Sequence, residues 1–430
     1  MSKAQIFNNI LGVLVIVISG ILGGFILAGA TSVFIILSKS GTKRLYFILT
    51  LILFTFFLAD NYDGILSFAQ NLRFVILGLS FLILLRHKLF KDNKGLMLLG
   101  FTIYTFLITS IFSPLGLPAI LRSFGFLIVA LVIFKLINIL LKSDRQSTIN
   151  LIVTIFFTFF ILNIVVLILP IYEDSFYKGR FAGLMGNPNG LGLLAMFSYT
   201  LVYWIDKNES TSFSKKFFTI FKILIFLIII LTGSRTATLA VIAFELILRV
   251  YQNKFLLMLS LITLVLITIF INSVSFEEIG LSLGLTDYLR IDTLETASGR
   301  TEVWEVAYDE FLRQPWLGKG MLYDDYFIQD YSLKRFGENN ARNWNKVWNS
   351  YLSLALDVGI IGILLFGHFW YRLFKVSTDK IFGLAFIIMI LISAVTESWM
   401  AASMNPFMPV VFLIWALQTN HGKRLQKTAT

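Results

Sequence analysis

The chain consists largely of apolar runs, each about as long as a helix that crosses a bilayer, separated by short polar segments. Runs such as "TINLIVTIFFTFFILNIVVLILPIY" are apolar on every side, whereas strands of a membrane barrel alternate over about ten residues. The pattern predicts an all-α polytopic membrane protein. Its expected spans lie near 45–59, 64–85, 95–112, 115–141, 148–171, 189–206, 216–232, 235–250, 254–273, 350–374, 380–398 and 403–418.

The first apolar run, residues 6–38, is long for one helix and short for two. Gly23 and Gly24 offer a point where the chain can turn, so the total is about 13 or 14 transmembrane helices. The run has no small-residue cleavage site and is longer than a secretory signal. We therefore expect a retained span.

Basic loops fall on alternate sides of these spans, which places them and the C-terminus in the cytoplasm by the positive-inside rule. Thirteen of the 25 acidic residues lie in 274–348, the one segment between spans long enough to hold a small folded element. We expect a transmembrane region over 1–273, a partly helical extracytoplasmic loop over 274–348, and further spans with a cytoplasmic tail over 349–430.

Composition narrows the functional classes. The sequence contains no cysteine, which excludes thiol catalysis, cysteine metal sites and disulfides. The formal net charge of +11 is spread over short loops, which indicates orientation in the membrane and contact with lipid headgroups rather than nucleic-acid binding. We expect a multi-pass protein of the cytoplasmic membrane.

Five arginines oppose the charge rule because they lie on the outer side: Arg73, Arg122, Arg180, Arg235 and Arg300. A cation near hydrocarbon is costly unless carboxylates or an anionic ligand compensate it. Pairing with nearby acids such as Asp60 or Glu173 is one explanation. The planar fork of arginine also suits bidentate phosphate binding, so the group indicates an outer site for a phosphate or diphosphate.

The three histidines offer no alternative catalytic site on that side. His87 and His421 lie in cytoplasmic segments, and His368 lies about 18 residues into a helix that starts outside, near the inner surface at 1.5 Å per residue. No cluster has metal-ligand spacing, and Asp324-Asp325 reads as a solvated turn rather than a metal site.

Four segments, in order over roughly residues 180–365, resemble the O-antigen ligase and polymerase superfamily, whose members transfer glycans from polyprenyl-diphosphate carriers. They are "RFAGLMGNPNGLG", "LTGSRTATLA", "SGRTEVWEVAYDEFLRQPWLGKG" and "WNSYLSLALDVGIIGILLF". Each segment alone is weak, and their order around the long loop makes the signature more specific. The N-terminal half matches only as generic spans.

The resemblance implies a GT-C type membrane glycosyltransferase whose active site faces outward beneath the long loop. It implies that Arg235 and Arg300 hold the carrier diphosphate, and that Arg180, Asn187 and Asn189 belong to the site. Ligase members commonly carry a histidine where this chain has Trp348 before Asn349. That departure argues against a histidine-assisted mechanism.

The "GNPNG" stretch has a physical explanation within this picture. Its glycines permit a turn and close approach of backbone, Pro188 suits the first turn of a helix, and asparagine caps one. Because helix N-termini favour anions, we expect a helix start that faces the diphosphate together with Arg180. The plainer alternative is a loop with good capping chemistry.

Transfer from a diphosphate requires charge stabilisation at the leaving group, which arginines can supply, so we expect no metal or other cofactor. A base may assist the attacking hydroxyl. Candidates on the outer side are Glu302, Asp324, Asp325, Glu338, Asp357 and Glu397. Asp357 and Glu397 stand out because each lies in or at the end of an apolar helix, where ionised groups are usually functional or paired.

The expected function is polymerisation of polyprenyl-diphosphate-linked repeat units into a surface polysaccharide such as O-antigen, capsule or exopolysaccharide. Substrate contacts are expected from Arg73, Arg122, Arg180, Asn187, Asn189, Trp348 and Asn349, and catalysis from Arg235, Arg300, Asp357 and Glu397. The alternatives are ligase-type transfer to a lipid or protein, and a lipid-linked oligosaccharide flippase. Expected partners are the lipid-linked glycan, membrane lipid, a chain-length regulator and a flippase.

Overall fold

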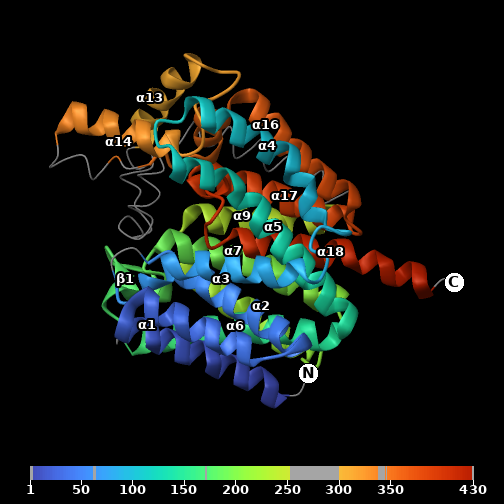
Figure 1. The fold of residues 1–430 in the computed structure, drawn as a ribbon. Coiled ribbons are helices and arrows are strands. Elements are labelled where there is room, and N and C mark those ends of the chain that lie inside the picture. The colour runs from blue at the N-terminus through green and yellow to red at the C-terminus, as the bar shows by residue number, and fades with distance from the viewer. Residues whose placement is uncertain are drawn as a thin grey trace, which may run out of the picture.

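The structure is a computed structural model that describes residues 3–61, 64–169, 172–251, 300–337, 344 and 346–428. The expected span 254–273 and Glu338 lie outside the described residues. Within them the chain is helical apart from short turns and a small antiparallel pair, β1 (Phe176–Tyr177) and β2 (Arg180–Phe181) (Figure 1). The all-α polytopic class is confirmed.

Every other expected span coincides with a helix. The described helices are α1 (Lys3–Ser38), α2 (Gly41–Leu58), α3 (Phe68–Leu85), η1 (Lys94–Leu98), α4 (Leu99–Phe112), α5 (Leu117–Ser143), α6 (Arg145–Ile168), η2 (Glu173–Ser175), η3 (Gly183–Met185), α7 (Pro188–Asn208), α8 (Lys215–Leu231), α9 (Arg235–Val250), α13 (Arg300–Leu312), α14 (Tyr323–Phe336), α16 (Ser350–Val376), α17 (Lys380–Val395), η6 (Ser398–Met400) and α18 (Met408–Thr428).

Seven of the described helices are long and apolar enough to cross a membrane, and α17 and α18 add shorter apolar stretches. The seven are α1 to α6, with η1 and α4 counted as one continuous stretch, and α16. In this count α1 is one stretch, although it contains two helical arms. The expected total of 13 or 14 included helices such as α8 and α9 that are shorter than 18 residues.

The first helix turns back on itself. Gly23 and Gly24 have non-helical backbone angles, and φ at Gly24 is +63°, a conformation that favours glycine. The hydroxyl of Thr31 donates to that of Ser19 at 3.2 Å, although an uninterrupted helix would separate the two by about 18 Å. The apolar run 6–38 is therefore a helical hairpin.

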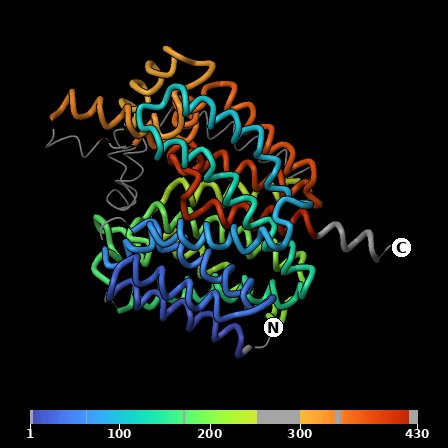
Figure 2. The backbone as a smooth tube through the Cα atoms, in the orientation of Figure 1, coloured from blue at the N-terminus to red at the C-terminus, as the bar shows by residue number. Residues whose placement is uncertain are grey.

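The second helix forms the centre of the N-terminal half. All its residues from Leu45 to Leu58 are buried, which is typical of a helix surrounded by others rather than one with a single apolar face. Phe57 packs against Phe156 and Phe159 of α6, with ring centroids 5.2 and 4.9 Å apart. Helix α2 packs against α1, α3, α5 and α6, and Figure 2 shows the blue segments of the N-terminal helices together in the lower half of the view.

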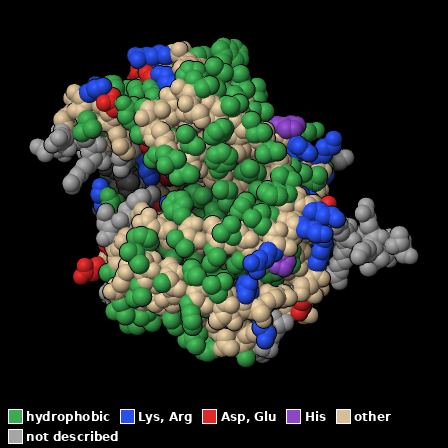
Figure 3. Space-filling model, viewed as in Figure 1, with side chains coloured by type: hydrophobic (Ala, Val, Ile, Leu, Met, Phe, Trp, Pro, Cys, Tyr) green, Lys and Arg blue, Asp and Glu red, His purple; other side chains and the backbone are tan. Residues whose placement is uncertain are grey.

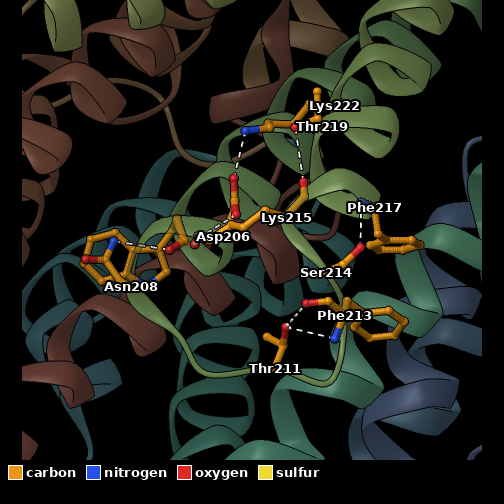
Figure 4. Close-up of polar contacts among 10 residues, drawn as sticks. Asp206, Asn208, Thr211, Phe213, Ser214, Lys215, Phe217, Thr219 and Lys222 are labelled. Carbon is orange, nitrogen blue, oxygen red and sulfur yellow. Dashed lines mark hydrogen bonds and ion pairs between the residues drawn. The ribbon is translucent and has the colours of Figure 1, made fainter.

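One end of the molecule is basic and the band beside it is apolar. Figure 3 shows lysine and arginine side chains gathered at the right end, next to broad apolar surface. The turn between α7 and α8 belongs to this end, where Asp206 pairs with Lys215 and Lys222 at 2.9 Å each (Figure 4). Ser214 caps α8 by accepting from the Phe217 amide. These contacts fix a polar turn at the side expected to be cytoplasmic.

The orientation can be tested with single cysteines, because the chain has none of its own. We expect Lys178→Cys, in the β1–β2 turn, to react with a membrane-impermeant maleimide added to intact cells. Lys215→Cys, on the basic end, should react only after permeabilisation. The reverse pattern would invert the orientation derived from the basic loops.

Candidate active site at the outer ends of the helices

A cavity of about 220 Å³ opens where the segments expected on the outer side converge. It takes its walls from the loops after α2 and α17, the start of α7, the start of α14 and the segment before α16. The charged and amide residues among its lining are Asp60, Arg122, Asn187, Asn189, Asp324, Asp325, Lys346, Glu397 and Asn405. No histidine is among the described residues that line it.

Glu397 is the centre of a hydrogen-bond network on one wall. Its Oε1 accepts from Asn189 Nδ2 at 2.9 Å and from Arg300 Nη2 at 3.2 Å. Arg180 in turn donates to the Asn189 side-chain oxygen at 2.5 Å and to the Thr232 carbonyl at 2.8 Å. Through one carboxylate the network connects the segment between α17 and η6 with α7 and α13, and through Asn189 and Arg180 with β2 and the turn between α8 and α9.

The other oxygen of Glu397 makes no hydrogen bond to the described residues, and the side chain lines the cavity. Burial raises the pKa of Glu397, opposed by the charges of Arg300, Lys346 and Arg180. A carboxylate with one oxygen fixed by two donors and the other unused is suited to accept a proton from a bound hydroxyl.

The start of α7 follows the expected capping chemistry. Asn187 accepts from the Asn189 amide at 3.1 Å, and Pro188 occupies the first helical turn. However, Asp60 lies at this helix start, since Asn187 Nδ2 donates to its Oδ2 at 2.9 Å. A Cβ on Gly190 would lie 2.1 Å from the same oxygen, so a side chain there would displace the Asp60 carboxylate. A carboxylate of the protein therefore lies where we expected a diphosphate.

Two cations line the cavity. Arg122, from α5, makes no side-chain hydrogen bond or ion pair with the described residues, and its Nε is buried without a partner. Burial raises the pKa of both Asp60 and Glu397, and the positive charge of the nearby Lys346 opposes this rise. Sequence reasoning missed Lys346 because it considered arginines, although its place two residues before Trp348 was a signal.

Trp348 lines the cavity and lies 6.0 Å from the Arg300 guanidinium, measured to the ring centroid. Its φ of +50° is rare for a bulky residue, a strain that the surrounding structure must hold in place. The Val347 carbonyl accepts from Trp304 Nε1 at 3.0 Å. Asn349 caps α16 by accepting from the Tyr351 and Leu352 amides, and is not among the cavity residues.

Asp357 lies within α16, away from the cavity lining. Its two carboxylate oxygens accept from the Leu322 and Asp324 backbone amides at 3.1 and 3.0 Å. Asp357, on α16, therefore accepts hydrogen bonds from backbone amides at the start of α14 that have no partner within their own helix. The first turn of α14 presents Asp324 and Asp325 to the cavity, so Asp357 contacts the cavity wall from behind and does not itself line the cavity.

Asp324 is buried beside Asp325, and burial with this like charge raises the pKa of Asp324 to about 7. The nearby Arg122 opposes the shift. The preceding Leu322 has φ of +67°, so a second strained backbone lies at the cavity, as at Trp348. Such strain often accompanies functional positions.

Arg73, Arg235 and His368 are not among the residues that line the cavity. Arg73 Nη1 donates to the Met404 carbonyl at 2.6 Å, next to Asn405 of the cavity wall. Arg235 begins α9, one residue after Ser234. His368 lies in the later part of α16, which agrees with its expected distance from the outer side.

The buried carboxyl of Asp324 predicts a dependence of stability on pH. Its pKa in the folded chain is above the ordinary value of 3.8, so stability is lost as pH rises from about 4 to about 7, by at most about 1.4 kcal/mol per pH unit. Asp324→Asn should remove this loss, and its thermal midpoint in detergent should exceed that of the parent at pH 8 but not at pH 4.

Asp330→Asn is the matched control, because that exposed carboxylate pairs with Lys334 on the same helix. It should leave the pH dependence unchanged. Parallel pH curves for the parent and Asp324→Asn would contradict the assignment.

Comparison with known proteins agrees with the resemblance stated above. Residues 220–367, from α8 to the middle of α16, match the family model of O-antigen ligase. No curated protein matches the chain. The matched region contains Arg235, Arg300, Trp348 and Asp357, and it supports the O-antigen ligase and polymerase superfamily.

Proposed function

From the O-antigen ligase match over residues 220–367, we propose that the chain polymerises polyprenyl-diphosphate-linked repeat units into a surface polysaccharide. The reaction takes place on the outer face of a bacterial cytoplasmic membrane. The single observation that carries the proposal is the cavity that combines Glu397, the unpaired Arg122 guanidinium and the Trp348 ring. These groups match a proton acceptor, an anion ligand and a sugar-stacking surface, respectively.

In the proposed reaction, a hydroxyl of the acceptor glycan attacks the anomeric carbon of the donor. The bond between that carbon and the diphosphate oxygen breaks, and the polyprenyl diphosphate leaves with the bonding electrons. Glu397 accepts the hydroxyl proton on its unused oxygen. Arg122 and Lys346 lie in the cavity, where fixed cations stabilise the charge that grows on the leaving group.

Arg300 and Arg180 have a further part in this proposal. Both are engaged with the Glu397 network, Arg300 directly and Arg180 through Asn189. They hold the base in place, and Arg300 also lies beside the Trp348 ring. Direct contact of Arg235 and Arg300 with the carrier diphosphate, as the resemblance implies, is part of the same proposal.

The donor must reach the outer face before it can react, so a flippase has to supply it, and a chain-length regulator is a suitable second partner. We propose that the reaction needs no metal. Ligase-type transfer would use the same residues with a different acceptor. The absence of histidine among the described cavity residues favours polymerisation, because histidine is the base expected of the ligase branch.

The test is an assay with purified protein and a synthetic polyprenyl-diphosphate repeat unit. We expect a ladder of products that differ by one unit and that persists in EDTA. Transfer of a single unit to an added acceptor without a ladder would identify a ligase. Movement of the lipid across vesicles without any new glycosidic bond would identify a flippase and contradict the proposal.

Variants separate the roles of the cavity residues in this assay. Arg122→Ala should lower kcat/KM by about 10- to 100-fold, the usual cost of a lost charged hydrogen bond. Glu397→Gln should lower kcat by about 10²- to 10⁴-fold, as for the loss of a general base. Arg249→Ala, at the exposed inner end of α9, is the matched control and should keep parental activity.

The pH profile gives a second readout. Because Glu397 must be deprotonated and its pKa is raised, the parental rate should fall as pH decreases through that pKa. The residual rate of Glu397→Gln should lack this fall. An unchanged profile in the variant would exclude Glu397 as the base while leaving the polymerase proposal intact.

A further inference from the structure

The "PWLGKG" stretch and the following Met321, residues 315–321, connect α13 to α14 and lie alongside α4. We call them the 315–321 turn. Tyr104 Oη lies 3.0 Å from the Leu317 carbonyl and 3.1 Å from that of Val358. The Met321 amide donates to Thr109 Oγ1 at 3.0 Å. The turn thus follows α4 from Tyr104 to Thr109.

On its other side the turn is bonded to α16, which bends at Gly359. The Ile360 and Ile361 amides donate to the carbonyls of Pro315 and Trp316 at 2.9 and 3.2 Å. In the opposite direction, the Lys319 and Gly320 amides donate to the Leu356 and Asp357 carbonyls at 2.9 and 2.8 Å.

Glycine is required where the two backbones meet. A Cβ on Gly318 would lie 2.5 Å from the Gly359 amide nitrogen, and one on Gly359 would lie 2.5 Å from the Trp316 carbonyl oxygen. Both glycines also have positive φ, at +73° and +61°. This contact lets the turn replace helical hydrogen bonds that α16 loses at its bend.

The contacts place the turn well below the outer ends of two membrane helices. Ile361 follows the start of α16 by eleven residues, and Tyr104 precedes the end of α4 by eight. At 1.5 Å per residue along α4, Tyr104 is about 12 Å from the end of that helix, against a hydrocarbon thickness of about 30 Å. Both helices belong to stretches long and apolar enough to span a membrane.

Two apolar side chains of the turn are exposed, whereas the charged Lys319 of the same turn forms an ion pair with Glu310 of α13. Trp316 is 63% exposed and Leu317 36%, and Ile103 on α4 is exposed as well. In contrast, the exposed start of α13 carries Glu302 and Glu305. Figure 1 shows α13 on the same side of the bundle as α4 and α16. Non-helical backbone at membrane depth requires bonded polar groups, and the contacts with α4 and α16 supply partners for the carbonyls of residues 315–317 and the amides of residues 319–321.

We infer that the 315–321 turn is a re-entrant element that inserts Trp316 and Leu317 among the lipid acyl chains of the leaflet on the cavity side. The expected extracytoplasmic loop 274–348 is then anchored in the bilayer at this turn. The inference concerns lipid contact and does not depend on the proposed catalytic activity.

Spin labels on single cysteines test the depth of the turn. The label is placed at Trp316→Cys, with Ile103→Cys on α4 as the lipid reference and Tyr326→Cys on exposed α14 as the aqueous reference. The protein is reconstituted into phosphatidylcholine and phosphatidylglycerol vesicles. Collision with oxygen, which enters lipid, is compared with collision with a water-soluble nickel chelate.

At position 316 we expect an oxygen-to-nickel ratio close to that at 103 and several-fold above that at 326. A ratio equal to that at 326 would place the turn in water and overturn the inference. Leu312→Cys, at the exposed end of α13, is measured in parallel with Trp316 intact. A value there between the two references supports insertion, whereas an aqueous value at both 312 and 316 contradicts it.

Discussion

The pairing of Glu397 with Asn189 and Arg300 is the interaction on which the outer face depends. A carboxylate at the end of a membrane helix is costly unless donors satisfy it, and here two donors meet at one oxygen. Those donors come from segments 208 and 97 residues away in sequence. The same carboxylate that lines the cavity thereby also determines which loops surround it.

The second constraint is the bend of α16 at Gly359. A regular helix would bond its own amides and leave no attachment for the segment between α13 and α14. The bend exposes carbonyls and amides that bind the 315–321 turn, and Asp357 then satisfies the start of α14. Asp324 consequently reaches the cavity from a backbone that is hydrogen-bonded to α16 at Lys319, Gly320, Leu322 and Asp324.

Much of the fold followed from the sequence because hydrophobic runs determine helices in a membrane. The hairpin at Gly23 and Gly24 and the cap at Asn187 were also visible, since both rest on local backbone chemistry. The sequence did not reveal that Asp60 accepts a hydrogen bond from the Asn187 side chain. Asp60 is 127 residues away, and only the packed bundle brings it to the start of α7. Local rules indicated an anion site without revealing that the chain supplies its own anion.

Asp357 is a second residue whose partners could not be predicted from the sequence. An acidic residue in an apolar helix is usually functional or paired, and the sequence could not distinguish the two. The structure places its partners among backbone amides of a distant turn, which no side-chain pattern can indicate. Asp324 was visible only as half of a polar pair, yet it is buried, whereas the neighbouring Asp325 is half-exposed.

Lipid insertion of the 315–321 turn connects the bilayer to the cavity by a short path. Only Leu322 and Tyr323 separate the turn from Asp324, and the backbone at Leu322 is held in a strained conformation. A displacement of the turn would therefore shift the Asp324 wall directly, because Asp357 bonds both the Leu322 and Asp324 amides. Membrane anchoring at Trp316 thus stabilises the geometry of the cavity wall formed by Asp324 and Asp325.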